Sequence, residues 1–149
     1  MSFTSGVPPL DRYFRDQVSQ DVRRRATACD VALEAPGAGI AGYYTLAAGG
    51  VPLAGLPESI ARGLPRYPSV PVARLGRLAV DRAYRGRKLG SALLWDAGMR
   101  ALRAEFAAFA LVVDAKDESA EAFYLHHGFV FLVSQHRQRF LPLATFAKA

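Results

Sequence analysis

The sequence contains a single cysteine, Cys29, among its 149 residues. One thiol cannot form an intramolecular disulfide, and a lone cysteine in an apolar stretch usually behaves as a small buried hydrophobic residue. The chain also has no run of about twenty uninterrupted apolar residues, and its first residues, MSFTSG, lack the basic and apolar segments of a secretion signal. These absences exclude a disulfide scaffold and predict a cytoplasmic protein that does not associate with a membrane.

Acidic residues are few. The chain has 13 Asp and Glu against 19 Lys and Arg, which gives a formal net charge of +6. Most of the cations are arginines, whose planar guanidinium suits bidentate contacts with phosphate or carboxylate, so we expect an anionic ligand or partner. With 51% hydrophobic residues, the chain has enough apolar side chains for one core, and we expect a single domain, 1–149.

The spacing of apolar residues divides the chain into alternating helices and strands. Helical spacing predicts an amphipathic helix over 9–19, a helix from Leu89 to about Ala101, and a helix over 119–126. The stretch 49–71 is rich in proline and glycine, which permits only a short helix near 57–62. Strands are predicted at 26–33, 40–46, 72–80, 108–113, 129–133 and 140–143. The pattern indicates an α/β fold.

The joint between the strand ending at Val80 and the helix near Leu89 has the composition of a phosphate-binding loop. It contains RGRKLGS, residues 85–91, in which three cations and two glycines surround the start of the helix. Glycine lets a ligand approach the backbone, and the N–H groups of a first helical turn supply fixed positive potential. The segment therefore predicts a pyrophosphate site, with an exposed basic helix start that binds nothing as the alternative.

This segment resembles the acyl-CoA signature of the GNAT superfamily of acetyltransferases, except that Lys88 stands at the middle glycine position. We expect lysine there to need only ordinary right-handed helical dihedrals and to keep its amide donor. Residues 117–129, DESAEAFYLHHGF, resemble the closing helix, turn and strand of the same family. The resemblance implies a mixed, mostly antiparallel central sheet flanked by helices, with a V-shaped opening between the central strands.

The resemblance also implies acetyl-CoA as co-substrate and indicates the residues that bind it. The pantetheine arm is expected to pair with the backbone of the central strand at Leu78, Ala79 and Val80. Asp117 stands where many members carry an asparagine that contacts the cofactor. We expect Asp117 or Ser119 to cap the following helix, with a cofactor contact as the alternative role of Asp117. The pyrophosphate is expected at the joint, on Arg85, Gly86, Arg87, Lys88, Leu89, Gly90 and Ser91.

Tyr124 looks like the catalytic tyrosine of the family. Acetyl transfer releases a thiolate, and a phenol with a pKa of about 10 can donate a proton or hydrogen bond to a thiol with a pKa of about 8.5. A packing role for this aromatic ring is the alternative. The adjacent His126 and His127 point in different directions on a helix, and no carboxylate or cysteine completes a ligand set, so we expect no metal site.

The strand over 72–80 lacks the general base that many GNAT enzymes carry there, because Arg74 and Arg77 occupy it instead. Asp81 and Glu58 lie in turn-like stretches, where we expect capping or solvated carboxylates. An α-amino group has a pKa of about 7.7–8 and is partly neutral at pH 7, so it needs no strong base. The sequence therefore favours an α-amine as the acceptor.

Four further segments resemble the GNAT toxins of bacterial toxin–antitoxin modules. This resemblance implies that the acceptor is the α-amino group of aminoacyl-tRNA and that its acetylation blocks translation. It also implies a ribbon-helix-helix antitoxin as the partner. The oligomeric state stays open, with a homodimer as one possibility. These toxins usually carry a further N-terminal strand, so we expect either a misassigned start or a bare sheet edge here. The segments are GYYTLAAG, LPRYP, RLAVD and DAKDE, at residues 42–49, 64–68, 77–81 and 114–118.

Arginines are the candidates for contact with tRNA, because phosphate contacts position a nucleic acid electrostatically. A solvated face is the alternative for each of them. Two other functions also stay open: a GNAT enzyme that acetylates a small amine or a protein N-terminus, and a CoA- or nucleic-acid-binding protein without turnover. The predicted substrate-binding residues are Arg23, Arg24, Arg25, Arg74 and Arg77.

Overall fold

The computed structural model describes residues 3–132 and 135–148. Among the helices of these residues, none is long and apolar enough to cross a membrane. The helices are α1 (Pro8–Asp16), α2 (Val18–Arg23), α3 (Glu58–Ala61), α4 (Leu89–Arg103), α5 (Glu118–His126) and α6 (Ala144–Ala147), with two 3-10 helices, η1 (Leu53–Gly55) and η2 (Arg82–Tyr84). The strands are β1 (Ala28–Leu33), β2 (Ile40–Pro52), β3 (Ser69–Val80), β4 (Ala110–Asp114), β5 (Val130–Leu132) and β6 (Gln135–Pro142).

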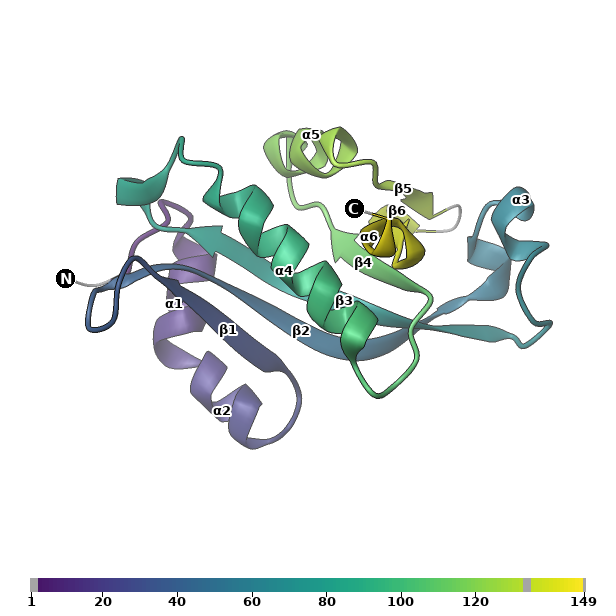
Figure 1. Ribbon diagram of the computed structural model, residues 1–149, viewed down its shortest axis with the longest axis horizontal. Helices are drawn as coiled ribbons and strands as arrows, with labels where there is room; N and C mark the ends of the chain where they lie inside the picture. The colour runs from purple at the N-terminus through teal and green to yellow at the C-terminus, as the bar shows by residue number, and fades with distance from the viewer. Residues whose placement is uncertain (1–2, 133–134, 149) are drawn as a thin grey trace. The chain divides into compact units, whose positions relative to one another are not determined.

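The six strands form one sheet in the order β1-β2-β3-β4-β6-β5 (Figure 1). The pairs β1–β2, β4–β6 and β5–β6 are antiparallel. The predicted α/β class, a mixed and mostly antiparallel sheet flanked by helices, is confirmed. Among the described strands β1 and β5 are the outermost. The V-shaped opening between the central strands stays a prediction.

The residues divide into two compact units. Unit 1 comprises Met1–Ala47 and Leu75–Ala97, and unit 2 comprises Ala48–Arg74 and Gly98–Ala149. Strands β2 and β3 and helix α4 each contribute residues to both units. The single domain over 1–149 expected from the chain length stays a prediction.

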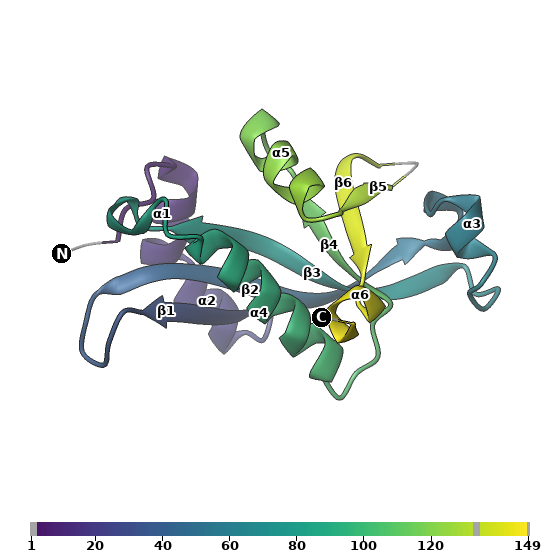
Figure 2. The same ribbon diagram turned by 45° about the horizontal axis from the view of Figure 1, so that its top comes forward.

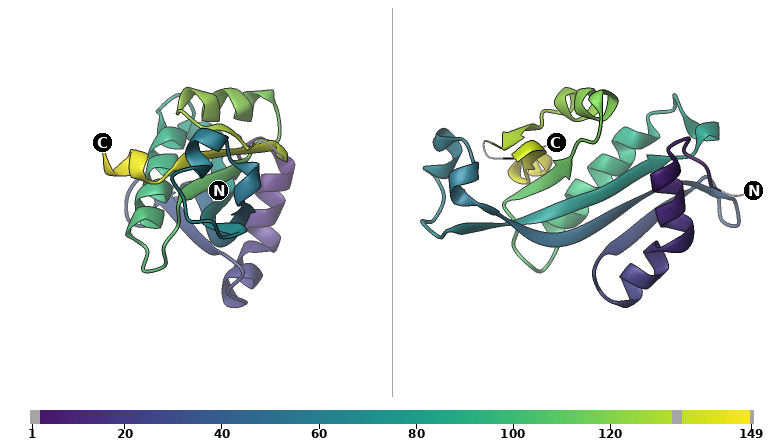
Figure 3. Two further views of the ribbon diagram at one scale, coloured as in Figure 1. Left: turned by 90° about the vertical axis from the view of Figure 1, so that its right-hand side faces the viewer. Right: turned by 180° about the vertical axis from the view of Figure 1, so that it is seen from behind.

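In unit 1, β2 directs successive side chains to opposite faces of the sheet, as the period of a strand requires. Tyr43 faces α1, where its ring stacks on Phe14 with centroids 4.5 Å apart and its hydroxyl donates to the carbonyl of Leu10 at 2.7 Å. Tyr44 faces α4, where its hydroxyl donates to the Asp96 carboxylate at 2.6 Å. Figure 3 shows α1 and α2 lying across one face of β1 and β2.

The helix predicted over 9–19 is two helices in the structure. The chain leaves the helical region at Gln17 (φ −124°, ψ −34°), and α2 begins at the next residue. This break buries Tyr13 and Val18 in one apolar cluster and lets the Tyr13 hydroxyl donate to Asp21 at 2.7 Å. Tertiary packing therefore overrides a continuous helical pattern.

Unit 2 has its own apolar core, and Figure 2 shows β6 beside β4 with β5 on its other side. The last helix, α6, packs closely on the second half of α4. A Cβ atom on Gly98 would lie 2.1 Å from the ring of Phe146, so glycine is required for this approach. The buried core residues are Val51, Leu56, Val70, Val72, Ala110, Val112, Leu132 and Phe140.

The stretch 49–71, predicted as a loop, is partly regular structure, because β2 and β3 both extend into it. The glycines of β2 permit this extension. A Cβ on Gly49 would lie 2.7 Å from the Arg74 Nε atom, and one on Gly50 would lie 2.7 Å from the Ser69 hydroxyl, so β3 side chains lie over the glycines. The predicted short helix is confirmed as α3.

The other predicted elements are present with shifted ends. Strands β1, β4 and β5 and helices α4 and α5 overlap the predicted ranges and are confirmed. Strand β6 begins at Gln135, earlier than the predicted start at 140, and α6 was not predicted. Val133, at the end of the predicted range 129–133, lies outside the described residues.

Candidate functional site

The end of β3 leads into η2, which is anchored by Asp81. The Asp81 carboxylate accepts hydrogen bonds from the backbone N–H groups of Ala83 and Thr4, each at 2.9 Å. The carbonyl of Thr4 accepts in turn from the N–H of Arg82 at 2.9 Å. The predicted capping role of Asp81 is confirmed, and the N-terminal segment is fixed to the joint by the same carboxylate.

Between η2 and α4, both Gly86 and Lys88 have a left-handed backbone, with φ of +79° and +62°. The expectation of right-handed dihedrals at Lys88 is therefore wrong. Helix α4 begins only at Leu89, and the Lys88 carbonyl accepts from the N–H of Ala92 at 3.1 Å, so Lys88 precedes the first helical turn. A left-handed residue other than glycine costs about 1–2 kcal/mol, which explains why glycine fits this position better.

The backbone of this joint suits an anion. Turns with left-handed residues form concave nests of N–H groups that bind anions. The N–H groups of Leu89 and Gly90 lie in the first turn of α4, where a helix offers them no internal partner and its dipole places positive potential. Apart from Gly86 and its two chain neighbours, no atom of the described residues lies within 4 Å of the place where a Cβ on Gly86 would stand. The segment is therefore open on that side, and binding of a pyrophosphate there stays a prediction.

Neighbouring groups of unit 1 hold the two arginines of the joint. Arg85 donates to a backbone carbonyl of the N-terminal segment, at Ser5. The Arg87 guanidinium lies 3.9 Å from the Glu34 carboxylate and 5.2 Å from the centroid of the Tyr84 ring. These contacts orient the arginine side chains while both remain exposed to solvent.

Sequence reasoning did not identify Glu34 and Tyr84 as part of the joint. The Tyr84 hydroxyl donates to the Glu34 carboxylate at 2.8 Å, and this hydrogen bond raises the pKa of Tyr84. Glu34 lies 50 positions earlier in the chain, after β1, so no local pattern links it to the joint. The pairing of β1 with β2 places Glu34 near Ile40, and the N–H of Asp81 donates to the carbonyl of Ala41 at 2.8 Å, which connects β2 to the start of the joint.

The residues expected to hold the pantetheine arm form the end of β3. Ala79 is buried in the apolar cluster of unit 1 with Tyr13 and Tyr43, whereas Leu78 and Val80 are half-buried. Buried side chains on this strand fix its backbone in place, and the strand runs directly into η2 and the joint. Pairing of this backbone with coenzyme A stays a prediction.

Tyr124 belongs to unit 2, on helix α5. Asp117 caps this helix as predicted, because its carboxylate accepts from the N–H of Ala120 at 2.8 Å. The Tyr124 ring is 7% exposed and lies 5.2 Å from the Phe123 ring and 5.3 Å from the Phe129 ring, centroid to centroid. Burial raises the pKa of Tyr124 well above its ordinary value, so the phenol keeps its proton at neutral pH.

The two histidines that follow Tyr124 stack edge to face, with centroids 5.2 Å apart. Burial, and then the neighbouring His126, lower the pKa of His127. Across residues 3–132 and 135–148, no group of three His, Cys, Asp or Glu is placed to hold a metal ion.

The predicted substrate arginines divide into two kinds. Arg23, Arg24 and Arg25 are exposed at the end of α2, and Arg25 has a left-handed backbone with φ +59°. Arg77 and Arg74 instead contact their own units: the Arg77 guanidinium lies 3.4 Å from the centroid of the Tyr13 ring, and Arg74 donates to the carbonyl of Gly50 at 3.2 Å. A role for any of the five in substrate binding stays a prediction.

The chain resembles known proteins over most of its length. The family described as Acetyltransferase (GNAT) matches residues 10–129. A protein of Mycobacterium tuberculosis (strain ATCC 25618 / H37Rv) named tRNA-acetylating toxin is 39% identical over 86% of this chain and 76% of its own length. A protein of Sinorhizobium fredii (strain NBRC 101917 / NGR234) named probable toxin TacT is 28% identical over 97% of this chain and 84% of its own.

Solved structures share the fold. A KacT tyrosine-to-phenylalanine mutant has a TM-score of 0.87 at 23% identity, covering 99% of this chain and 89% of that one. AtaT complexed with acetyl-methionyl-tRNAfMet has a TM-score of 0.83 at 25% identity, covering 98% and 88%. An AtaT mutant bound to the C-terminus of the antitoxin AtaR and acetyl-CoA has a TM-score of 0.78 at 22% identity, covering 98% and 86%.

Proposed function

This chain belongs to the Acetyltransferase (GNAT) family, and on that premise we propose that it transfers the acetyl group of acetyl-CoA to the α-amino group of an aminoacyl-tRNA and so blocks translation. The observation that carries this proposal is the 39% identity, over 86% of the chain, to a protein named tRNA-acetylating toxin. The complex of AtaT with acetyl-methionyl-tRNAfMet, at 25% identity, supports the same substrate class. The net charge of +6 suits an RNA substrate.

Acetyl-CoA supplies the activated acetyl thioester. We assign its pyrophosphate to residues 85–91, where the left-handed turn and the start of α4 present backbone N–H groups beside three cationic side chains. We assign its pantetheine arm to the backbone of residues 78–80. This binding holds the thioester in place for attack, which converts a bimolecular encounter into an oriented reaction.

The acceptor nitrogen attacks the thioester carbonyl carbon, the carbon–sulfur bond breaks, and the nitrogen loses one proton to solvent. Tyr124 is the catalytic residue in this proposal, and it donates its phenolic hydrogen toward the leaving sulfur. A phenol is protonated at neutral pH even at its ordinary pKa of about 10. Burial raises the pKa of Tyr124, so the hydrogen-bond donor form also persists in alkaline solution. Stabilising the leaving thiolate lowers the barrier to carbon–sulfur cleavage.

The acceptor is an α-amine because the central strand offers no base. Strand β3 has the sequence SVPVARLGRLAV and carries no carboxylate, and Asp81 beyond its end is occupied as a cap. A lysine side chain, with a pKa of about 10.4, would need such a base, whereas an α-amine with a pKa of about 7.7–8 is partly neutral without one.

We also propose a ribbon-helix-helix antitoxin as the protein partner and the cytoplasm as the place of action, with a homodimer as the assembly to test. The complex of AtaT with the C-terminus of the antitoxin AtaR supports an antitoxin protein as the partner. Co-expression of this chain with the product of a neighbouring reading frame, followed by size-exclusion chromatography with light scattering, tests both the partner and the assembly.

Labelled acetyl-CoA with charged tRNA tests the proposed reaction directly. Label should appear on the aminoacyl end and should be released when the aminoacyl ester is hydrolysed, whereas uncharged tRNA should stay unlabelled. Transfer to a small amine or to a peptide N-terminus, with charged tRNA unlabelled, would instead support the other acetyltransferase function. Binding of coenzyme A without any transfer would support a protein without turnover.

A further inference from the structure

Helix α3 and the loop that follows it are fixed to unit 2 through their apolar side. Ile60, Ala61 and Leu64 pack against the core of that unit. The N–H of Leu53 donates to the carbonyl of Pro68 at 2.9 Å, which closes the segment at its base. Burial on one side and closure at the base hold the other side in a defined position without covering it.

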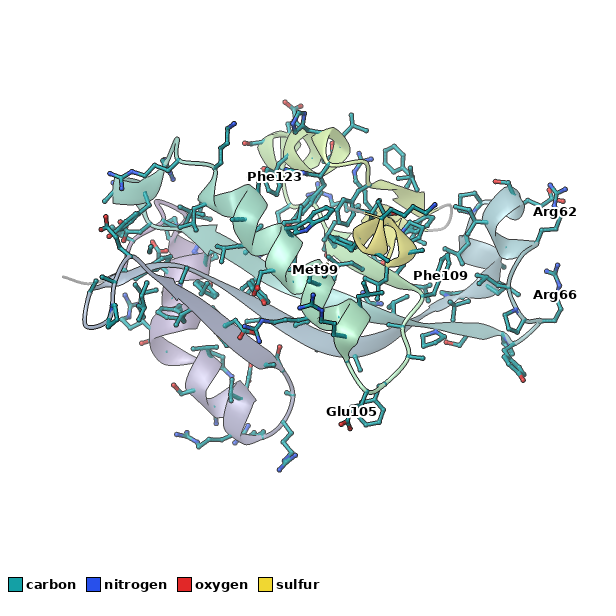
Figure 4. All side chains as sticks on the ribbon, viewed as in Figure 1. Arg62, Arg66, Met99, Glu105, Phe109 and Phe123 are labelled. Atoms are coloured by element: carbon teal, nitrogen blue, oxygen red, sulfur yellow. The ribbon has the colours of Figure 1, made fainter. Side chains whose placement is uncertain are left out.

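The uncovered side carries two like charges close together. Arg62 and Arg66 are both exposed, and the Arg66 guanidinium donates to the backbone carbonyl of Arg62 at 3.3 Å. Within the part of the chain that the structure describes, no carboxylate pairs with either guanidinium. Figure 4 shows both side chains pointing outward from α3 and its loop. Two adjacent cations without a protein counter-ion favour a ligand that carries successive negative charges.

Tyr67 follows these arginines and is 70% exposed. It stands between Arg66 and Pro68, and Pro65 precedes both, so the backbone here has little freedom: proline fixes its own φ and restricts the residue before it. A ring on a restrained backbone loses little conformational entropy when it acquires a partner. Such a ring, beside cations, is the arrangement on which unpaired bases stack.

We propose that Arg62, Arg66 and Tyr67 form a contact surface, the α3 surface, for the unpaired 3′ end of the tRNA. The arginines bind its phosphates and Tyr67 stacks on one of its bases. The inference rests on the proposed function, since an enzyme that acetylates the aminoacyl end must hold the nucleotides next to it. An acidic protein segment would satisfy the arginines but would not explain the restrained, exposed ring.

The affinity for uncharged tRNA, measured by fluorescence anisotropy, tests the α3 surface without any acetyl transfer. Tyr67→Ala should weaken binding about tenfold, because stacking contributes about 1–3 kcal/mol per base, whereas Tyr67→Phe should bind within about twofold of the wild type. The double variant Arg62→Ala with Arg66→Ala should also reduce the slope of log affinity against log salt by about two. On a tRNA trimmed of its unpaired 3′ nucleotides, Tyr67→Ala and the wild type should bind equally.

Two matched controls come from exposed residues elsewhere in unit 2. Phe106→Ala removes an aromatic ring that is 85% exposed. The double variant Arg103→Ala with Lys148→Ala removes two exposed positive charges, the same number as the α3-surface double variant. Both control variants should bind tRNA nearly as the wild type does. If the α3-surface variants behave like these controls, or if the Tyr67→Ala defect persists on trimmed tRNA, the proposal is overturned.

An assay of acetyl transfer to charged tRNA by the wild type distinguishes failure of the α3-surface proposal from failure of the proposed function. Transfer by the wild type, with α3-surface variants equal to their controls, would refute the α3 surface and leave the proposed function standing. Absence of both tRNA binding and transfer in the wild type would refute both.

Discussion

The guanidinium of Arg139 on β6 lies 3.8 Å from the carboxylate of Glu121 on α5, and so links the helix that carries Tyr124 to the sheet. The Arg139 side chain is 6% exposed, and that of Glu121 is 38% exposed. The Arg139 Cζ atom also lies 3.8 Å from the centroid of the Phe131 ring, and its Nε has no hydrogen-bond partner among the described residues. Among the described residues, the buried Arg139 cation therefore has one carboxylate partner, that of Glu121.

Replacing Glu121 should lower the free energy of unfolding more than replacing Arg139 does. A buried charge left without its counter-ion is more costly than a pair replaced by apolar atoms. We expect Glu121→Gln to lower the free energy of unfolding by about 1–3 kcal/mol, and Arg139→Met, which keeps the volume, by less than about 1 kcal/mol. Urea unfolding measures both. The reverse order would mean that packing of Arg139 on Phe131 outweighs the ion pair.

Replacing the proposed acid should affect turnover and leave coenzyme binding intact. Tyr124→Phe keeps the ring in its pocket but removes the hydroxyl, so kcat should fall about 100-fold or more while the affinity for coenzyme A stays near that of the wild type. Steady-state kinetics and calorimetry measure the two quantities. Unchanged kcat in Tyr124→Phe would leave this tyrosine as a packing residue only.

The pH dependence of the reaction should follow the acceptor amine. Burial raises the pKa of Tyr124, so its donor form persists from neutral into alkaline solution and is lost only when the pH passes that raised pKa. The amine must lose its proton, with a pKa of about 7.7–8, so kcat/KM should rise through that range and show no fall up to about pH 10. Initial rates corrected for spontaneous deacylation give the profile. A rising limb centred near pH 4–5 would instead indicate a carboxylate base.

Relieving the left-handed backbone at Lys88 should stabilise the protein. Lys88→Gly should raise the free energy of unfolding by about 1 kcal/mol, because glycine tolerates φ +62°. Gly86→Ala, at φ +79°, should lower it by a similar amount. If backbone N–H groups dominate the binding of coenzyme A, Lys88→Gly should weaken it by no more than about fivefold, the effect of one exposed charge. A larger loss would assign the main contact to the lysine side chain.

The basic end of α2 should contribute to RNA affinity through charge alone. With Arg23, Arg24 and Arg25 changed together to alanine, the slope of log affinity against log salt should decrease by about one for each phosphate that the variant no longer binds. The control is Arg15→Ala, because Arg15 already pairs with Asp16 at 3.1 Å. Binding to charged and uncharged tRNA should weaken equally. An unaltered slope in the triple variant would leave these arginines as a solvated face.

Local signals in the sequence were sufficient for most of the elements, although not for α6 or for the break between α1 and α2. Apolar periodicity predicted α4 and α5, the cap at Asp117 followed from its position before a helix, and the glycines and cations of 85–91 predicted an anion site. The two helices and the cap are confirmed because each depends on residues within about two turns of one another, where spacing along the chain sets spacing in the molecule. The anion site stays a prediction.

Tertiary structure decided everything that depends on distant residues. The contact of Glu34 with Tyr84 and Arg87 and the ion pair of Arg139 with Glu121 join segments that no local pattern relates. The positive φ at Lys88 belongs here too, because the spacing of apolar residues does not indicate the backbone conformation of the residue before α4. The sequence by itself thus determined which chemical groups each segment carries. The packing of remote side chains determined which of these groups lie in contact, because burial against a partner offsets the conformational entropy that an ordered side chain loses.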